Sequence, residues 1–403
     1  MILKLINIFK KCKFKIFNPK NYDILIFDDE ASCVVEKLLQ KHHFFTLKTR
    51  VENIDTIYLS IKIIILSFFY YRGNILSSYL ISLISIIKPK IVITYIDNSF
   101  KFSEIAYRFK KINKDIKFIA IQNGSRYEIL ENNYLFKKKI LKENLNNKFY
   151  IPIFLTFSNY EKKLYNALNI KFLKHYPVGN LTLEQYIKFK KQNKIKIKKK
   201  KQICLLSDHG AWQPKMMEKN NNLEKNFILL TEFCIKFAKK FNYKILICQK
   251  RMKNRNKLNS IENNNLDYYS EKKAFKKYLT KKNYSYFKKI LLKRDNIKYK
   301  TYLKMEESEV LVSTMSTMLK ENLFLRNKIL AANLTGERIY DFPLKKFFSF
   351  NDNNYNRFEK KLSSIIKMSK TAYFKKAGKN VDYCIVKNKR PSKMIMSVIK
   401  KYL

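Results

Sequence analysis

Residues 308–321 combine hydroxyls and a carboxylate in a pattern that can bind phosphate and sugar. They read SEVLVSTMSTMLKE, which is an apolar run, a turn rich in Ser and Thr, and the start of a helix. The first backbone N–H groups of a helix have no partner inside it, so a helix start flanked by hydroxyls favours a phosphate group. A carboxylate one turn in can accept hydrogen bonds from ribose hydroxyls. We therefore expect a nucleotide-sugar donor site formed by Ser313, Thr314, Ser316, Thr317 and Glu321.

The same residues also have a purely structural interpretation. Ser or Thr hydroxyls that cap a helix satisfy its first N–H groups without any ligand. A capping box needs an acid three residues after the cap, whereas Glu321 follows Thr317 by four residues and Ser316 by five. This spacing leaves Glu321 for another partner and favours donor binding over capping.

Two runs of the chain resemble a known family. ESEVLVSTMSTMLKENLFLRNKILAANLTG, within residues 305–336, looks like the donor-binding segment of GT-B glycosyltransferases, especially those of bacterial surface-carbohydrate biosynthesis. KPKIVITYIDNSFKFSEIAYRF and the following IKFIAIQNGSRYE, within residues 85–130, are similar to the amino-terminal half of the same group. The resemblance implies two doubly wound, Rossmann-like domains facing a cleft. It also implies metal-independent transfer in capsule or lipopolysaccharide (LPS) assembly.

The organisation along the chain is typical of an α/β protein. Short β-branched runs alternate with longer helical patterns, which predicts parallel sheets. Between Gln185 and Gln202 the sequence has dense like charge and no turn residues, which favours a solvated linker. We expect an acceptor-side domain over 1–186, a basic linker over 187–202, a donor-binding domain over 203–370, and a tail over 371–403 that packs on the first domain.

The expected elements follow from the same patterns. The expected strands are 23–27, 91–96, 117–121, 152–157, 203–207, 244–248, 297–300, 309–313 and 328–332. The expected helices are 30–41, 53–71, 75–87, 101–112, 159–168, 223–241, 271–292, 316–326 and 354–369. The apolar run 54–71 contains Lys62 and is followed by Arg72 and Gly73. The run 75–87 is shorter than the about 20 residues that span a bilayer, so we expect both to be helices packed in the protein, partly facing a membrane.

Candidate catalytic residues follow two of these strands. Ligands of open parallel sheets bind beyond the carboxyl ends of the strands. Asp97 ends the run IVITYI, and Asp208 with His209 follow ICLLS. A carboxylate or imidazole there can take the proton of an acceptor hydroxyl. Asp97 can instead be the nucleophile of a retaining mechanism, and His209 can also donate to the leaving phosphate. The structural alternatives are a helix cap for Asp97 and bonds to neighbouring backbone for the other two.

Amides and cations follow two more strands. Gln122, Asn123 and Gly124 come after KFIAI, and amides suit sugar hydroxyls because each supplies donors and an acceptor. We expect acceptor binding there, with a tight turn as the alternative. Lys250 and Arg251 follow KILIC and can pair with donor phosphates. In a chain with 84 Lys and Arg residues, such a placement can also be a coincidence.

The composition limits the partners. The formal net charge is +52, but the lysines alternate with Ile, Asn, Tyr and Phe along nearly the whole chain, and no nucleic-acid-binding motif occurs. This diffuse charge favours contact with the inner face of the cytoplasmic membrane over nucleic acid. An A+T-biased coding sequence gives a similar composition. Six scattered cysteines without a C-x-x-C pair favour free thiols in a cytoplasmic, reducing compartment.

Missing motifs narrow the function further. The sequence has no G-x-G-x-x-G, no P-loop, no H-E-x-x-H and no convincing D-x-D, so we expect no cofactor and no metal. The predicted function is a glycosyltransferase that moves a sugar from a nucleotide donor to a saccharide or lipid-linked acceptor. The alternatives are a GT-B-type epimerase or glycerophosphotransferase, and a non-catalytic basic α/β protein that binds RNA or anionic membrane.

Overall fold

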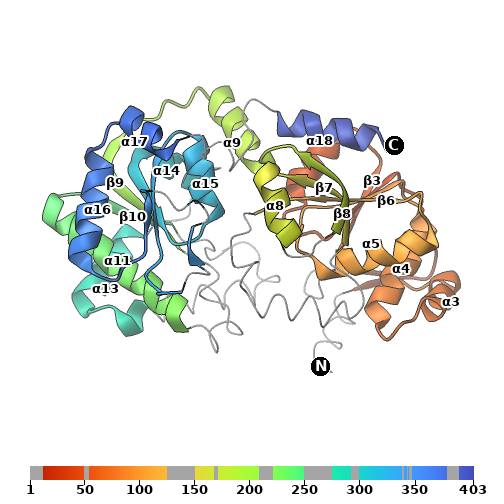
Figure 1. Cartoon of the computed structure of the whole chain (residues 1–403). Coiled ribbons are helices and arrows are strands. Elements are labelled where there is room, and N and C mark those ends of the chain that lie inside the picture. The colour runs from red at the N-terminus through yellow and green to blue at the C-terminus, as the bar shows by residue number, and fades with distance from the viewer. Residues whose placement is uncertain are drawn as a thin grey trace. The chain divides into compact units, whose positions relative to one another are not determined.

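The computed structural model divides the chain into two compact units. It describes residues 12–49, 54–124, 150–167, 171–207, 221–248, 275–291, 299–337, 340–342, 344, 347–378 and 390–403. Unit 1 comprises Met1–Gly124, Tyr134–Glu184 and Asn388–Leu403, and unit 2 comprises Ser125–Asn133 and Gln185–Lys387. Each unit contains a parallel β-sheet with helices on both faces (Figure 1).

The described residues of unit 1 form a six-stranded parallel sheet in the order β3-β2-β5-β6-β7-β8. Its strands are β2 (Ile24–Phe27), β3 (Phe44–Leu47), β5 (Ile91–Thr94), β6 (Lys117–Ile121), β7 (Tyr150–Thr156) and β8 (Lys171–Pro177). A separate pair joins β1 (Lys13–Lys15) to β4 (Thr56–Tyr58) in parallel. The central strands β2, β5 and β6 are mostly apolar because helices bury both of their faces.

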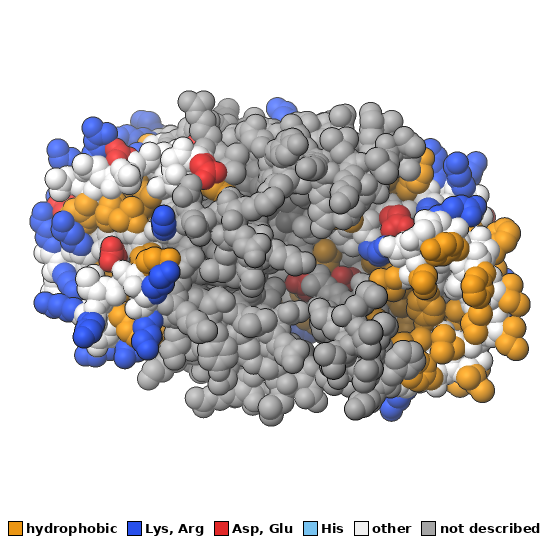
Figure 2. Space-filling model, turned by 90° about the horizontal axis from the view of Figure 1, so that it is seen from below, with side chains coloured by type: hydrophobic (Ala, Val, Ile, Leu, Met, Phe, Trp, Pro, Cys, Tyr) orange, Lys and Arg blue, Asp and Glu red, His pale blue; other side chains and the backbone are white. Residues whose placement is uncertain are grey.

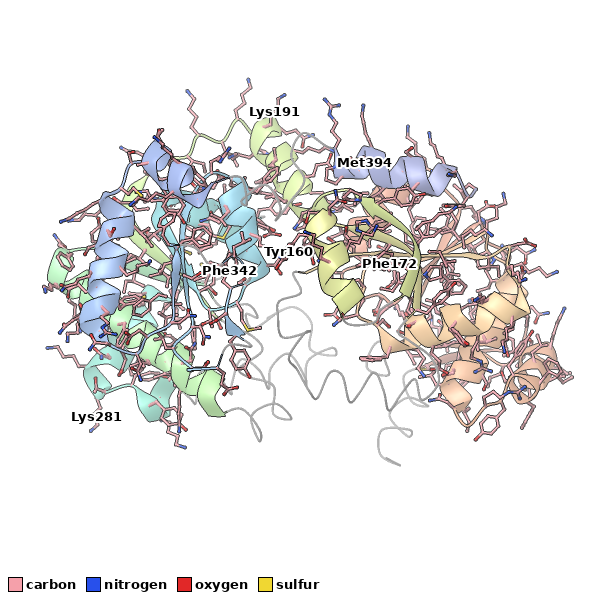
Figure 3. All side chains as sticks on the ribbon, viewed as in Figure 1. Tyr160, Phe172, Lys191, Lys281, Phe342 and Met394 are labelled. Atoms are coloured by element: carbon pink, nitrogen blue, oxygen red, sulfur yellow. The ribbon has the colours of Figure 1, made fainter. Side chains whose placement is uncertain are left out.

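One face of the unit 1 sheet packs against α2 (Cys33–Leu39), the start of α9 (Leu181–Gln192) and α18 (Pro391–Lys400). From α18, Ile395 and Ile399 are fully buried in this core and Met394 packs at its edge (Figure 3). The Glu184 carboxylate accepts hydrogen bonds from the backbone N–H and hydroxyl of Ser392, at 2.6 and 2.8 Å. A carboxylate at a helix start is favourable, so these bonds fix the beginning of α18.

The other face of this sheet packs against α5 (Phe100–Ile112) and α8 (Asn159–Ala167). Phe102 of α5 contacts Phe27 and Phe118, with both ring centroids 5.6 Å away. The ring centroid of Tyr165 in α8 lies 4.6 Å from that of Phe154 in β7. Beside α5 lies α4 (Ile75–Ile87), which forms a hairpin with α3 (Ile61–Phe69). Within the described residues, none of the helices combines the length and apolar character needed to cross a bilayer.

The described residues of unit 2 form a five-stranded parallel sheet in the order β10-β9-β11-β12-β13. Its strands are β9 (Lys200–Leu206), β10 (Lys244–Cys248), β11 (Ser308–Ser313), β12 (Lys328–Ala332) and β13 (Ser349–Phe350). Its helices are α11 (Asn221–Phe241), α13 (Lys281–Ile290), α14 (Lys300–Glu307), α15 (Thr317–Phe324), α16 (Tyr355–Lys367) and α17 (Lys370–Ala377). In Figure 1, α11 and α16 cover one face, and α14 and α15 cover the other.

Several predicted elements differ from the structure. The expected helix over 53–71 contains strand β4 and only then helix α3, because a continuous apolar run fits either element. The expected strand at 297–300 is wrong where it is described, since helix α14 begins at Lys300. Strands β3 and β8 and helix α17 were not predicted; FFTL and KFLKHYP lack the apolar run of a central strand.

The stretch expected as a basic linker, 187–202, is mostly regular structure. Helix α9 continues to Gln192, and strand β9 begins at Lys200. Tyr186 of α9 is fully buried and stacks on Tyr302, and Lys190 forms an ion pair with Glu306 at 2.8 Å. These tertiary contacts supply the burial and the opposite charge that the local sequence lacks.

Candidate functional site

Both sheets reverse their strand order at a point where polar residues follow the strands. In unit 2 the reversal lies between β9 and β11, and in unit 1 it lies between β2 and β5. Ligands of open α/β sheets bind at such switch points, outside the carboxyl ends of the strands. Ser313 ends β11, and Asp97 follows β5, so both predicted sites begin at a switch point.

The turn after β11 leads directly into α15, as the sequence predicts. The hydroxyl of Ser316 accepts a hydrogen bond from the backbone N–H of Met318 at 3.3 Å, so Ser316 is the N-cap. Thr317 is the first residue of the helix, and both side chains are half-buried. The structural interpretation of Ser316 is therefore confirmed, and α15 places a helix start at this edge of the sheet.

The two hydroxyls nearest the strand are fully buried and already have protein partners. Ser313 donates to the backbone oxygen of Leu206 at 3.4 Å. Thr314 accepts a hydrogen bond from the Asn226 side chain at 2.9 Å. The predicted set of donor hydroxyls thus contains one buried pair, Ser313 and Thr314, and one half-buried pair, Ser316 and Thr317.

Sequence reasoning missed the amides that hold this edge together. Asn226 of α11 donates to Thr314 and accepts from the backbone N–H of Leu334, so it joins the turn after β11 to the segment after β12. Asn333 and Asn351 both donate to Asp341 Oδ1, at 2.7 and 2.6 Å. The sequence holds many asparagines without a local motif, so no signal singles these out.

Glu321 is buried, with only 3 % of its surface exposed. Its Oε2 atom accepts a hydrogen bond from the Tyr302 hydroxyl at 2.9 Å. The capping-box role is thus not the only structural use of Glu321, because Tyr302 is one protein partner of the carboxylate that the spacing leaves for another group. Tyr302 lies on α14, where the sequence predicted no helix, and it stacks on Tyr186 with centroids 4.7 Å apart.

Asp97 lies at the centre of the corresponding edge in unit 1 and is 1 % exposed. Its Oδ1 accepts from the backbone N–H of Asn123 at 3.3 Å, and its Oδ2 accepts from the Tyr165 hydroxyl. The helix cap of α5 is Ser99, which accepts from the N–H of Phe102 at 3.2 Å. The alternative that Asp97 caps this helix is therefore wrong.

The predicted Gln122–Gly124 segment is a turn held by its own amide. Gln122 is buried; its Oε1 accepts from the N–H of Phe157, and its Nε2 donates to the backbone oxygen of Gly124, both at 2.9 Å. Asn123 and Gly124 are half-buried. Gln122 thus ties the end of β6 to the end of β7 and leaves the next two residues partly accessible.

His175 of β8, which sequence reasoning did not single out, bonds to Thr156 beside this edge. The two side chains are 2.8 Å apart, and the Thr156 hydroxyl also donates to the backbone oxygen of Ser158. Because a hydroxyl has one hydrogen, His175 Nε2 is the donor in this pair. Burial, and then the charge of Lys162, lowers the pKa of His175 from 6.5 to about 4.

The remaining predicted residues lie outside the described part of the chain. They are Asp208, His209, Lys250 and Arg251. Among the described residues, no group of three or more His, Cys, Asp and Glu side chains is arranged to hold a metal ion.

Comparison with known proteins identifies the fold. No protein-family model matches the chain, and no curated protein matches it by sequence. The UDP-GlcNAc 2-epimerase of Methanocaldococcus jannaschii, in complex with UDP-GlcNAc and UDP, matches with a TM-score of 0.53 at 12% identity, covering 94% of this chain and 99% of that one. The wall teichoic acid polymerase TagF matches with a TM-score of 0.53 at 11% identity, covering 94% and 89%. The UDP-N-acetylglucosamine 2-epimerase of Rickettsia bellii matches with a TM-score of 0.53 at 12% identity, covering 94% of this chain and 96% of that one.

These structures have the GT-B fold, and the present chain shares it over nearly its whole length. The fold is α/β, with two Rossmann-like parallel sheets. At these identities the likeness defines the fold class.

Proposed function

We propose that this chain is a GT-B-type glycosyltransferase. It moves a sugar from a nucleotide-activated donor to a saccharide or lipid-linked acceptor in the assembly of a surface polysaccharide, such as capsule or LPS. The supporting observation is the β11–turn–α15 segment, which presents the half-buried hydroxyls of Ser316 and Thr317 at a helix start beside the switch point of a parallel sheet.

In the proposed reaction the acceptor hydroxyl attacks the anomeric carbon of the donor sugar. The bond from that carbon to the phosphate oxygen breaks, the nucleotide leaves with the electron pair, and the hydroxyl proton passes to a base. The start of α15 stabilises the leaving phosphate through its N–H groups and dipole. Asp208 and His209 are the proposed proton carriers, and Lys250 and Arg251 the proposed phosphate partners.

Four of the buried predicted residues have positioning roles in this proposal, and the fifth, Glu321, has a binding role. Ser313 and Thr314 shape the turn that presents Ser316 and Thr317. Asp97 and Gln122 hold the turn that presents Asn123 and Gly124 to the acceptor. Glu321, supported by Tyr302, accepts hydrogen bonds from the donor ribose.

A panel of nucleotide sugars tests the proposal on the full chain. One class among UDP-, GDP-, CDP- and CMP-linked donors should raise the melting temperature, because a ligand at 100 times its Kd adds about 2.7 kcal/mol to the stability of the folded state. The double variant Ser316→Ala/Thr317→Val should lose most of this shift. The control Ser313→Ala should lower the melting temperature without ligand but keep the shift.

The outcomes separate the proposal from a non-catalytic role. No shift with any donor, together with steeply salt-dependent binding to RNA, would favour the basic binding protein and contradict the enzyme.

Glu321 has a matched control in Tyr302. Glu321→Ala should raise the donor KM at least tenfold or abolish transfer, since it removes the proposed ribose acceptor. Tyr302→Phe removes only the hydroxyl that donates to Glu321, so its donor KM should stay within about threefold of the wild-type value. Transfer at the wild-type rate in folded Glu321→Ala would show that this assignment is wrong.

A second candidate is an epimerase or a glycerophosphotransferase on the same fold. It is favoured by the epimerase and TagF structures that match the chain. The products distinguish the reactions. A glycosyltransferase transfers the sugar alone and releases the whole nucleotide, a diphosphate from UDP-, GDP- and CDP-linked donors and CMP from CMP-linked donors. A glycerophosphotransferase transfers glycerophosphate and releases CMP from a CDP-linked donor, and an epimerase yields an isomeric nucleotide sugar without acceptor. For each, we propose a cytoplasmic protein that contacts the inner face of the cytoplasmic membrane.

A further inference from the structure

The α3–α4 hairpin of unit 1 exposes an apolar surface. Its most exposed large side chains are 61–79 % exposed: Ile61, Ile65, Phe68, Phe69 and Ile75. Only Ile63 of α3 is buried. Figure 2 shows hydrophobic side chains gathered over this end of unit 1. Clusters of this kind mark interaction sites, whereas single exposed apolar residues are ordinary.

The segment around β1 extends this surface. Because β1 pairs with β4, the residues after Lys15 lie beside the start of α3. Ile16 and Phe17 are exposed there, and an open cavity of about 600 Å³ is lined by both of them and by Ile61, Ile65 and Leu66. We call these residues together with α3 and the start of α4 the hairpin surface; it comprises residues 12–20 and 56–76.

The charge of the hairpin surface has one sign. Residues 12–20 and 56–76 contain no Asp or Glu, and their cations are Lys13, Lys15, Lys20, Lys62 and Arg72. An apolar surface with cations beside it matches an anionic bilayer, where apolar side chains enter the interface and cations meet the headgroups.

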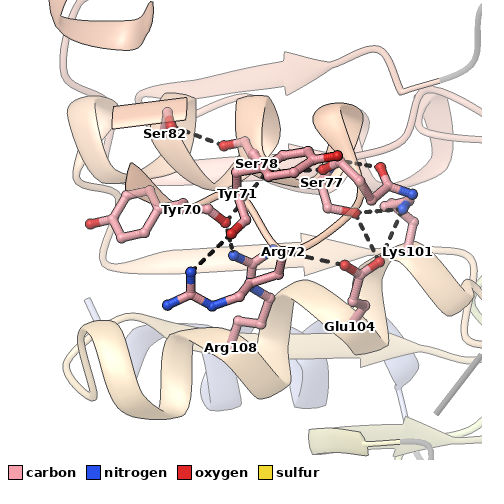
Figure 4. Close-up of polar contacts among 10 residues, drawn as sticks. Tyr70, Tyr71, Arg72, Ser77, Ser78, Ser82, Lys101, Glu104 and Arg108 are labelled. Atoms are coloured by element: carbon pink, nitrogen blue, oxygen red, sulfur yellow. Dashed lines mark hydrogen bonds and ion pairs between the residues drawn. The ribbon is translucent and has the colours of Figure 1, made fainter. Parts of the chain in front are cut away.

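Hydrogen bonds to α5 and between α3 and α4 hold the hairpin in place. Arg108 of α5 donates to the backbone oxygen of Tyr70 in the turn between α3 and α4 (Figure 4). Glu104 of α5 accepts hydrogen bonds from Ser77 of α4 and from Lys101, both at 2.9 Å. Ser67 of α3 bonds to Ser82 of α4 at 3.2 Å. Polar bonds thus hold the inner side of the hairpin, and the exposed apolar side chains belong to an anchored element.

We propose that the hairpin surface docks this protein on an anionic membrane, with α3 lying in the bilayer interface. Nine helical residues span only about 13 Å, so α3 cannot cross a hydrocarbon core of about 30 Å. Charge favours a membrane over a second copy of the chain as the occupant, because copies that each have a net charge of +52 repel one another. The inference does not depend on the proposed transfer reaction.

Vesicle flotation of the full chain tests the docking. The vesicles contain phosphatidylcholine alone or with about 30 % phosphatidylglycerol, at salt concentrations of about 0.1 and 0.5 M. The anionic vesicles should bind the protein at both concentrations, because salt screens charges but leaves apolar insertion intact. Phe68→Ser should lower the partition constant about tenfold at high salt. The matched control Leu173→Ser, on β8 and 70 % exposed, should stay within about twofold.

Three outcomes would overturn the proposal. They are equal binding of wild type and Phe68→Ser, complete loss of wild-type binding at high salt, and a wild-type dimer that Ile65→Ser/Phe68→Ser/Phe69→Ser converts to monomer. The donor-induced thermal shift should persist in this triple variant, so a failed docking test and a failed enzyme assignment remain distinguishable.

Discussion

The two sheets hold their switch points with different chemistry. In unit 1 the central group is the carboxylate of Asp97, which accepts from Asn123 and Tyr165. In unit 2 it is the amide of Asn226, which donates to Thr314 and accepts from Leu334. Both carboxylate oxygens of Asp97 accept, whereas the amide of Asn226 joins an acceptor to a donor. The edge of unit 1 is therefore centred on a carboxylate and the turn after β11 on an amide, while the buried carboxylate of Asp341, also in unit 2, accepts from Asn333 and Asn351.

Both edges nevertheless divide their polar residues in the same way. In unit 2, Ser313 and Thr314 are buried, and Ser316 and Thr317 are half-buried. In unit 1, Gln122 is buried, and the next two residues are half-buried. The polar group nearest a strand end lies between sheet and helix, so it must bond to protein, while residues one or two positions later can meet a ligand.

The largest effect is expected for Asp97→Ala. It removes the carboxylate that accepts from the Tyr165 hydroxyl and the Asn123 N–H, so the free energy of unfolding should fall by about 3–4 kcal/mol. Asp97→Asn keeps one oxygen and should cost about 1 kcal/mol. Urea denaturation measures both, and hydrogen exchange of β5 and β6 should show the loss in unit 1. If Asp97→Ala is as stable as wild type, the Asp97 carboxylate does not stabilise unit 1.

Asn226→Ala should act on unit 2 alone. It removes two buried hydrogen bonds and leaves their partners unpaired, so we expect a loss of about 2–3 kcal/mol. Hydrogen exchange should increase in β11 and β12 and stay unchanged in β5. Asn193→Ala, at an exposed position, is the matched control and should cost less than about 0.5 kcal/mol. An equal increase of exchange in both sheets would contradict the separation of the two edges.

His175 should make unit 1 sensitive to acid. Its pKa is about 4 in the folded protein, and the ordinary pKa of a histidine, 6.5, applies to the unfolded chain, so between these pH values only the unfolded chain takes up the proton. Stability present above pH 6.5 should fall as the pH drops toward 4, by up to about 2 kcal/mol between about pH 7.5 and pH 5. Denaturation at several pH values should show that the free energy of unfolding of wild type falls over this range and that this fall is absent in His175→Gln. Parallel pH profiles would show that His175 titrates normally.

The smallest effect is expected for Ser316→Ala. Loss of an N-cap costs about 1 kcal/mol, and Ser316→Asn should retain the stability because Asn also caps. Thermal denaturation without ligand measures this difference. If both variants keep wild-type stability, the cap contributes nothing, and the bonds of Ser313 and Asn226 hold the turn in unit 2 without it.

The local sequence pattern predicts an element well where it fits only a helix or only a strand. Helix α4 has the predicted bounds, since Asn74 caps it and Lys88 ends it in a left-handed conformation. The prediction fails in the region 53–71, because its apolar residues fit a strand as well as a helix. Pairing with β1 decides that residues 56–58 form strand β4. Helix α9 shows the opposite case, where distant residues stabilise a segment that its own charge would keep solvated.

The sequence by itself determines two layered α/β units with polar residues after their apolar strands, because β-branched runs must be buried on both faces and polar groups must not be. Only the tertiary structure decides which polar groups are taken up by the protein. The partners of Asp97 and Glu321 are tyrosines 68 and 19 residues away, in a chain with 27 tyrosines. Hydrogen bonds of this kind depend on distances between elements, and no local pattern encodes them.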